Sequence, residues 1–221
     1  MTLISCEHAG NEVPADYSHL FENHRRVLGT HRGWDPGALP VALQLSLLTE
    51  AVLYVYTYTR LLVEPNRRLH HRNLFSFITQ SLSSEDKESI LKTYYRPYRN
   101  SVEKAIREGL NDGPVRHFSI HSFTPVWEGK SRKVEIGLLY DPASPLEADT
   151  CLKLKAYLQA NSELCIRMNQ PYRGAADGFT TYLRKQFPVN YAGIEIEVSQ
   201  AIATSRAVEI ASLLAAAIRQ L

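Results

Sequence analysis

The chain has 221 residues, of which 44% are hydrophobic and 22% are charged, and its formal net charge is +2. This composition is ordinary for a folded globular protein, and the small net charge gives no support for bulk binding of nucleic acid. The length is most simply read as one domain spanning residues 1–221, with enough chain to bury a sizeable core.

The chain has three cysteines, an odd number, and they lack the spacing of a paired-cysteine motif. Disulfides are therefore not expected, and a reducing cytoplasm is the natural compartment. The amino terminus shows neither the basic nor the apolar region of a secretion signal. No apolar run approaches the ~20 residues that span a bilayer, so no membrane partner is expected.

Strands and helices are predicted to alternate along the chain. In chain order they are a strand at Leu3 and Ile4, helix 39–49, strand 51–57, helix 84–108, strands 115–121 and 134–140, helix 146–160, strand 164–168, helix 178–186, strand 192–198 and helix 201–220. Pro97 should kink or interrupt the long helix. The alternation indicates a three-layer α/β/α fold with a mostly parallel or mixed central sheet.

Two histidines follow apolar, strand-like runs at separate points in the chain. His8 comes after the first strand, and His121 ends strand 115–121. A single histidine is more often structural, but ligands of α/β folds gather beyond the carboxyl ends of the strands. A catalytic zinc takes three protein ligands and keeps one open position. Asp35 is the preferred third ligand, although it could instead cap helix 39–49, and Glu12 is the competitor.

A pair of glutamates lies in the last predicted strand. Glu195 and Glu197 alternate with Ile194, Ile196 and Val198, so both carboxylates share one face of the strand. If that face meets solvent, the two charges need no explanation. If it faces the site, one glutamate can take a proton from metal-activated water and pass it to a leaving amine. The alternation does not say which glutamate does so.

Several cationic or amide side chains fall near predicted strand ends and in a polar, glycine-rich loop. A solvated surface accounts for many such residues, but planar guanidinium groups also suit the recognition of carboxylates. The candidates for substrate binding are Arg60, Asn66, Arg67, Arg173 and Arg184.

Eight sequence segments in order resemble the N-formylglutamate amidohydrolase family. They are SCEHAGNEVP, HRGWDPGA, TRLLVEPNRR, PYR, HSFTP, GLLYDP, PYRGAADGFTTYLR and YAGIEIEVSQ, and they span residues 3–200. The resemblance implies a zinc-dependent hydrolase with a fold like that of zinc carboxypeptidases and aspartoacylases. The implied reaction is cleavage of the C–N bond of a small N-acyl amino acid, such as N-formylglutamate.

The resemblance also implies roles for individual residues. His8, Asp35 and His121 match metal-ligand positions, and Glu197 matches the carboxylate that activates water. The implied substrate-binding positions are Asn66, Arg67 and Arg184. One departure is Glu64-Pro65 directly before the Asn-Arg pair, because Pro65 fixes the backbone there and bears on substrate choice.

Two other functions fit the same residues. The fold could be a non-catalytic binding module for a carboxylated ligand, with the arginines as anchors and a structural metal or none. It could also be a zinc peptidase that acts on the ends of short peptides. Release of product from N-acyl amino acids, and its loss on chelation, would separate the first proposal from a binding module.

Overall fold

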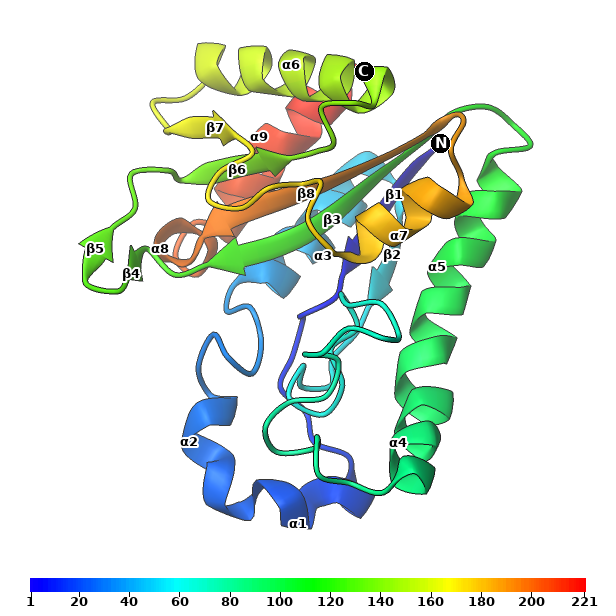
Figure 1. Cartoon of the computed structure of the whole chain (residues 1–221). Coiled ribbons are helices and arrows are strands. Elements are labelled where there is room, and N and C mark those ends of the chain that lie inside the picture. The colour runs from blue at the N-terminus through cyan, green and yellow to red at the C-terminus, as the bar shows by residue number, and fades with distance from the viewer.

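A six-stranded sheet runs through the molecule in the strand order β2-β1-β3-β8-β6-β7 (Figure 1). The computed structural model describes all residues, 1–221. The strands are β1 (Thr2–Cys6), β2 (Val52–Val55), β3 (Val115–Phe123), β6 (Ile136–Leu139), β7 (Ile166–Met168) and β8 (Tyr191–Ser199). The first four in the spatial order are parallel, whereas β6 pairs with β8 in the antiparallel sense. The predicted mixed, mostly parallel sheet is confirmed.

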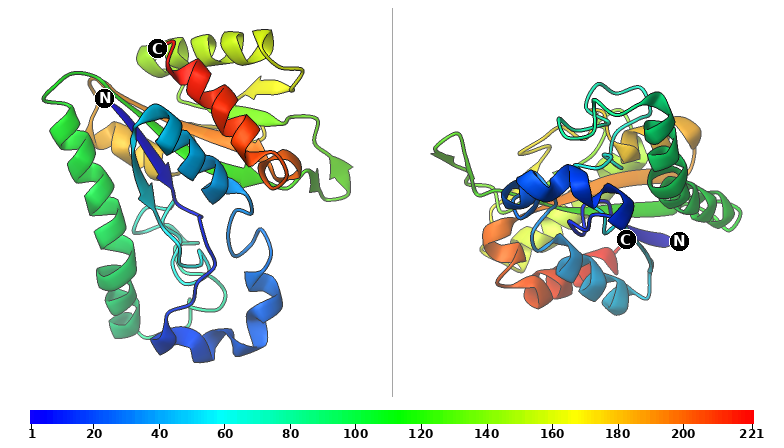
Figure 2. Two further views of the ribbon diagram at one scale, coloured as in Figure 1. Left: turned by 180° about the vertical axis from the view of Figure 1, so that it is seen from behind. Right: turned by 90° about the horizontal axis from the view of Figure 1, so that it is seen from below.

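Helices cover both faces of this sheet, as the two views of Figure 2 show. One face carries α3 (Ala38–Thr49), α6 (Pro145–Ala160) and α9 (Ala207–Ile218), and the other carries α5 (Arg96–Gly109) and α7 (Phe179–Gln186). Leu3 and Ile4 are neighbours in β1 but pack into the two different hydrophobic clusters. Successive strand side chains point to opposite faces, so helices on both faces bury nearly every residue of the central strand β3.

The long predicted helix 84–108 forms, with a change of winding in its middle. It comprises α4 (Ser84–Ile90), a π-helical turn η3 (Leu91–Tyr95) and α5. Ser83 caps the start, because its hydroxyl accepts a hydrogen bond from the Asp86 amide at 3.0 Å. Pro97 has no amide hydrogen and clashes with the carbonyl four residues earlier, so the wider π turn directly before it relieves both problems.

Some segments differ from the prediction. The last predicted helix, 201–220, is split into α8 (Gln200–Ala203) and α9. Residues between the first strand and Thr30, expected as loop, hold the short helices α1 (Ser18–Phe21) and α2 (Arg25–Leu28) with the 3-10 turns η1 (Ala15–Tyr17) and η2 (Glu22–His24). A small hairpin of β4 (Val126–Trp127) and β5 (Lys130–Ser131) was not predicted and projects from the body (Figure 1). None of the helices combines the length and the apolar character needed to cross a bilayer.

The carboxyl ends of β1, β3 and β8 lie at one edge of the sheet because these strands are parallel neighbours. In this register His121 of β3 stands beside Glu197 of β8. The chain after β1 then runs against the chain after β2, where the Ala9 amide donates to the Tyr56 carbonyl at 3.1 Å. Gly10 permits this approach, since a Cβ there would overlap the Thr57 carbonyl oxygen.

Candidate metal centre

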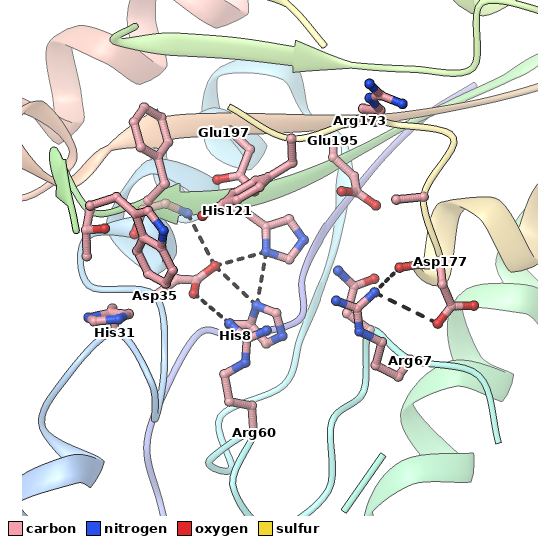
Figure 3. A pocket seen from close by; sticks show the side chains of 17 residues that line it. His8, His31, Asp35, Arg60, Arg67, His121, Arg173, Asp177, Glu195 and Glu197 are labelled. Carbon is pink, nitrogen blue, oxygen red and sulfur yellow. Dashed lines mark hydrogen bonds and ion pairs between the residues drawn. The ribbon is translucent and has the colours of Figure 1, made fainter. Parts of the chain in front are cut away.

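Three polar side chains from distant parts of the chain meet at this edge of the sheet (Figure 3). His8 follows β1, Asp35 precedes α3 and His121 lies in β3, and all three are buried. The Nδ1 atoms of the two histidines are 3.1 Å apart. Asp35 Oδ2 lies 3.2 Å from Nδ1 of His8 and 3.0 Å from Nδ1 of His121. The three potential ligand atoms therefore form a nearly equilateral triangle.

The spacing of this triangle suits a divalent metal ion. Ligand bonds to zinc are about 2.0–2.1 Å long, and a tetrahedral arrangement then separates two ligand atoms by about 3.3 Å. Two imidazole nitrogens and one carboxylate oxygen are donors that zinc and its neighbours in the first transition row accept. These three are also the group of metal-binding side chains that comes together in the fold.

Asp35 fits the third position better than Glu12. The Glu12 carboxylate accepts a hydrogen bond from the Thr57 hydroxyl at 2.8 Å and does not line the cavity that contains the histidines. Asp35 does not cap α3, whose N-cap is Gly37 without any capping side chain. Glu12 is therefore not placed as a metal ligand, and Asp35 is not a helix cap.

A carboxylate lies behind each histidine ring. Nε2 of His8 donates to Glu64 Oε1 at 2.5 Å, and Nε2 of His121 lies 3.3 Å from Glu7 Oε2. Ser119 adds a second contact to His121 Nε2 at 2.9 Å. A ring that carries its proton on Nε2 offers the lone pair of Nδ1 to a metal, so these contacts select the ligating tautomer. Sequence analysis did not assign this role to Glu7 or Glu64.

The carboxylates around the triangle are held in their ionised form. Burial alone would raise the pKa of Glu7, but the hydrogen bond and positive charge of His121 lower it well below its usual value. For Glu64, burial is likewise outweighed by the charges of Arg60 and His8, so its pKa is also lowered. The pKa of Asp35 is lowered against burial by His8 and His121. Concentrated buried negative charge of this kind favours a bound cation.

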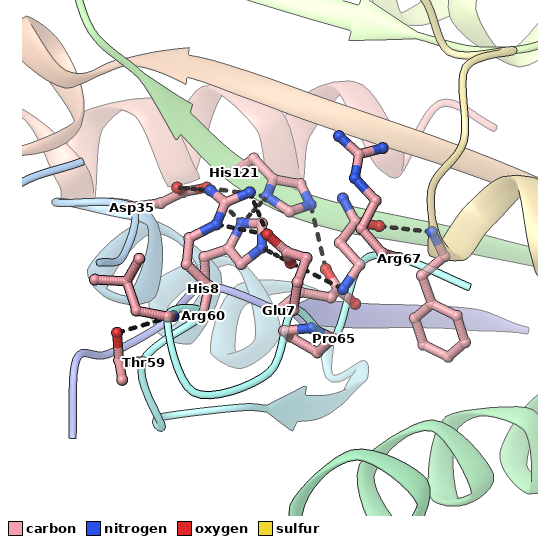
Figure 4. Close-up of polar contacts among 12 residues, drawn as sticks. Glu7, His8, Asp35, Thr59, Arg60, Pro65, Arg67 and His121 are labelled. Carbon is pink, nitrogen blue, oxygen red and sulfur yellow. Dashed lines mark hydrogen bonds and ion pairs between the residues drawn. The ribbon is translucent and has the colours of Figure 1, made fainter. Parts of the chain in front are cut away.

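Arg60 lines the cavity, but its guanidinium group is engaged with two of these carboxylates (Figure 4). Its Nε donates to Glu64 Oε2 at 2.7 Å, and its Nη1 lies 3.3 Å from Asp35 Oδ1. The side chain remains 25% exposed. Arg60 thus fixes the orientation of Asp35 and Glu64, and its exposed edge faces the cavity where a substrate would lie.

Glu195 and Glu197 both line the cavity but differ in their partners. Glu195 Oε1 accepts a hydrogen bond from the Thr180 hydroxyl at 2.8 Å. Glu197 is buried, and its Oε2 has no hydrogen-bond partner. Burial raises the pKa of Glu197 to about 7 and the charge of Asp35 adds to this, although the charge of His121 opposes it. A buried carboxyl group with this pKa can both accept and release a proton near neutral pH.

Asn66 and Arg67 reach the cavity from the segment after Glu64 and are anchored to the loop before α7. Asn66 Oδ1 accepts a hydrogen bond from the Phe179 amide at 2.6 Å. Arg67 Nη1 donates to the carbonyl of Asp177 and lies 3.9 Å from its carboxylate. These contacts join two loops into one wall and leave Asn66 Nδ2 and the rest of the guanidinium group available to a ligand.

The same segment is supported from behind by the helix that bears the π turn. Arg99 is buried, and its Nη1 donates to the Pro65 carbonyl at 2.8 Å. The Tyr95 hydroxyl donates to the Arg67 carbonyl at 2.6 Å. The Arg99 guanidinium lies 4.1 Å from the centre of the Phe179 ring, a cation–π contact in place of an ion pair.

The two remaining predicted substrate-binding arginines have different surroundings. Arg173 is exposed, lines the cavity and has no ion pair, so its charge is available to a ligand. Arg184 is not in the cavity. Its Nε pairs with the buried Glu147 at 2.7 Å, and its Nη1 and Nη2 donate to the carbonyls of Gly174 and Gly193 at 2.8 Å each. The expectation that Arg184 binds substrate is corrected, because Nε, Nη1 and Nη2 of its guanidinium group all donate hydrogen bonds within the protein.

The cavity has a volume of about 370 Å³. Besides the residues already described, it is lined by an aromatic group that sequence analysis did not single out: His31, Phe123, Trp127 and Tyr172. Trp127 belongs to a two-residue strand, and Tyr172 lies in the polar loop before α7. Neither position has a periodic pattern that would reveal its neighbours from sequence.

The fold and the site together define an α/β protein with a buried His-Asp-His cluster in a polar cavity at the carboxyl edge of its sheet. A sequence model of the N-formylglutamate amidohydrolase family matches residues 1–203. The chain therefore belongs to this family, whose name denotes hydrolysis of an amide bond.

Solved structures of similar proteins agree with this fold. A gene product of Agrobacterium tumefaciens is 28% identical with a TM-score of 0.84, covering 99% of this chain and 90% of that chain. The N-formylglutamate amidohydrolase of Ralstonia eutropha JMP134 is 16% identical with a TM-score of 0.68, covering 99% and 91%. A metallo-carboxypeptidase from Burkholderia cenocepacia reaches a TM-score of only 0.44 at 12% identity, covering 98% and 55%, and carries no conclusion about this chain. A search of curated proteins found no match.

Proposed function

We propose that this chain is a zinc-dependent amidohydrolase that cleaves the amide C–N bond of a small N-acyl amino acid. Family membership supports the reaction class, and the Nδ1, Oδ2 and Nδ1 triangle of His8, Asp35 and His121 supports the metal. The observation that carries the proposal is Glu197, a buried carboxylate beside that triangle with an unpartnered oxygen. The three free cysteines suit a cytoplasmic enzyme.

Different residues of the cavity have different roles in the proposed hydrolysis. A bound metal supplies Lewis acidity toward the scissile carbonyl and lowers the pKa of water. Glu197 takes the proton of the attacking water and later returns it to the departing amine nitrogen. Asn66, Arg67 and Arg173 bind the substrate carboxylate and so place the amide bond beside Glu197.

Glu197→Gln tests this assignment, with Glu195→Gln as the matched control two residues along the same strand. Gln keeps the shape of the side chain but cannot take up a proton. We expect kcat on an N-acyl amino acid to fall by about 10²–10⁴-fold in Glu197→Gln. Glu195→Gln should stay within about tenfold of wild type, because its carboxylate serves as an acceptor for Thr180. Metal content is measured in parallel and should be the same in all three proteins.

Wild-type turnover by Glu197→Gln with its metal retained would remove Glu197 as the base. Saturable binding of N-acyl amino acids without any turnover in the wild type would instead indicate the binding module. Faster cleavage of short peptides than of N-acyl amino acids would indicate the peptidase. Glu197 favours catalysis over binding, because a buried ionisable group without a partner lowers stability and brings no gain to a site that only binds carboxylates.

A further inference from the structure

Three aromatic rings cluster around one arginine at the edge of the cavity. The guanidinium carbon of Arg132 lies 5.5 Å from the ring centre of Phe123 and 5.3 Å from those of Trp127 and Tyr172. The Arg132 Nη1 also donates to the Tyr172 hydroxyl at 3.3 Å. Trp127 is 47% exposed and Tyr172 is 44% exposed, so much of this aromatic surface meets water. We call Phe123, Trp127 and Tyr172 the aromatic wall.

The aromatic wall lines the same cavity as the candidate metal ligands. The His31 ring packs edge-on against Trp127, with ring centres 6.1 Å apart. Figure 3 shows His31 beyond Asp35, whereas Arg67 and Asp177 lie on the opposite side of the two histidines. The metal centre is therefore flanked by an aromatic side and a carboxylate-binding side. An N-acyl amino acid held by its carboxylate at Arg67 directs its acyl group toward the aromatic wall.

The cavity offers two arginines, Arg67 and Arg173, to the carboxylate of a substrate. The charged lining consists of three arginines, and of four carboxylates that include Asp177 and Glu195. Arg60 among them already pairs with Asp35 and Glu64. Arg132 does not line the cavity, and Arg67 already contacts Asp177. The aromatic wall itself thus brings no cation to the lining of the cavity.

Resting on the proposed function, we infer that the preferred substrate is an N-acyl amino acid with an aromatic acyl group. A formyl group has one carbon and would leave the exposed rings of Trp127 and Tyr172 in water. An aromatic acyl group would stack on them, which is favoured both by apolar burial and by ring geometry. Hydrolysis adds water across the C–N bond and releases an aromatic carboxylic acid and the free amino acid.

The first test compares kcat/KM for N-benzoylalanine, N-formylalanine and N-formylglutamate. We expect wild type to prefer N-benzoylalanine to both formyl substrates by about tenfold or more. Trp127→Ala should lower the benzoyl-to-formyl ratio by about 10–100-fold, and Trp127→Phe should retain most of it. Val126→Ala is the matched control, since Val126 is exposed on the same short strand but does not line the cavity. It should leave the ratio unchanged.

A second test measures binding without turnover, using tryptophan fluorescence of the metal-free protein titrated with N-benzoylalanine. The chain has two tryptophans, so Trp34→Phe isolates the signal of Trp127. Saturable quenching should persist in Trp34→Phe, in which Trp127 is the remaining tryptophan. Equal or faster hydrolysis of N-formylglutamate, with a ratio insensitive to Trp127→Ala, would overturn the inference and leave the proposed function standing. Absence of all hydrolysis would overturn the proposed function, while absence of quenching in Trp34→Phe would separately overturn aromatic binding at Trp127.

Discussion

Glu197 is set apart from the other buried carboxylates of the site by its lack of partners. Glu7, Asp35 and Glu64 each have a cationic or histidine neighbour that lowers the pKa, against the effect of burial. For Glu197 burial prevails, and its pKa is raised from 4.5 to about 7. The same fold therefore keeps three carboxylates ionised as fixed charges and leaves one able to exchange a proton near neutral pH.

This difference predicts the pH dependence of stability in the metal-free protein. Because the folded pKa of Glu197 lies above the unfolded value, its stabilising contribution is full below 4.5 and is lost as the pH rises through about 7. Relative to wild type, Glu197→Gln should therefore gain about 3 kcal/mol in free energy of unfolding between about pH 4.5 and about pH 8. Urea denaturation of both proteins across this pH range, with a chelator present, measures the difference in free energy of unfolding. A difference that does not change with pH contradicts the raised pKa.

Sequence patterns predicted the candidate metal ligands better than the residues that contact and orient those ligands. His8 and His121 follow apolar runs, so strand ends could be predicted, and parallel pairing then brings those ends together. Glu64 accepts a hydrogen bond from His8, 56 positions earlier, and nothing in the local sequence of Glu64 reveals that contact. Arg184 was misassigned for the same reason, since its partner Glu147 lies 37 residues away on α6. Long-range ion pairs have no local signature, and sequence alone cannot distinguish a structural arginine from a binding one.

At the scale of elements, the π turn and α5 matter because they hold the segment that carries Asn66 and Arg67. Pro97 predicted a disturbance in the helix, and the π turn ending at Tyr95 is that disturbance. Tyr95 and Arg99 then reach the carbonyls of Arg67 and Pro65. The strand and helix types could be predicted from periodicity, but the split of the last helix and the β4–β5 hairpin could not, because short segments lack a period to read.

Arg99→Ala should loosen the carboxylate-binding segment without touching the metal ligands. We expect KM for an N-acyl amino acid to rise by about tenfold, with a smaller change in kcat, since a hydrogen bond from a charged donor is lost. Arg99→Lys keeps a charged donor and should recover part of the loss. Arg107→Ala is the control, because Arg107 lies on the same helix, is 66% exposed, and contacts Glu103 and the Phe187 ring but not the segment of Asn66 and Arg67. A kcat effect equal to the KM effect, or a similar loss in Arg107→Ala, would contradict a positioning role.

At the scale of the whole molecule, the mixed sheet explains why the site forms where it does. Four parallel strands bring the ends of β1, β3 and β8 to one edge of the sheet. Beyond them lie β6, which is antiparallel to β8, and β7, which is parallel to β6. Helices on both faces of the sheet bury the strands. Polar side chains near the carboxyl ends of the strands, such as Ser119 and Glu197, are therefore buried as well. The alternation of strands and helices predicted this architecture, and the family resemblance is confirmed by the match to residues 1–203.

The most direct test of the account is the metal content of the purified protein, measured by elemental analysis after dialysis against dilute zinc. Asp35→Asn removes the ligand charge with little change in shape, and Glu12→Gln is the control outside the cavity. The account predicts one tightly held zinc ion per chain in the wild type and in Glu12→Gln, and far weaker binding in Asp35→Asn. A wild type that retains no divalent metal, or an Asp35→Asn variant that retains it fully, would contradict the metal centre.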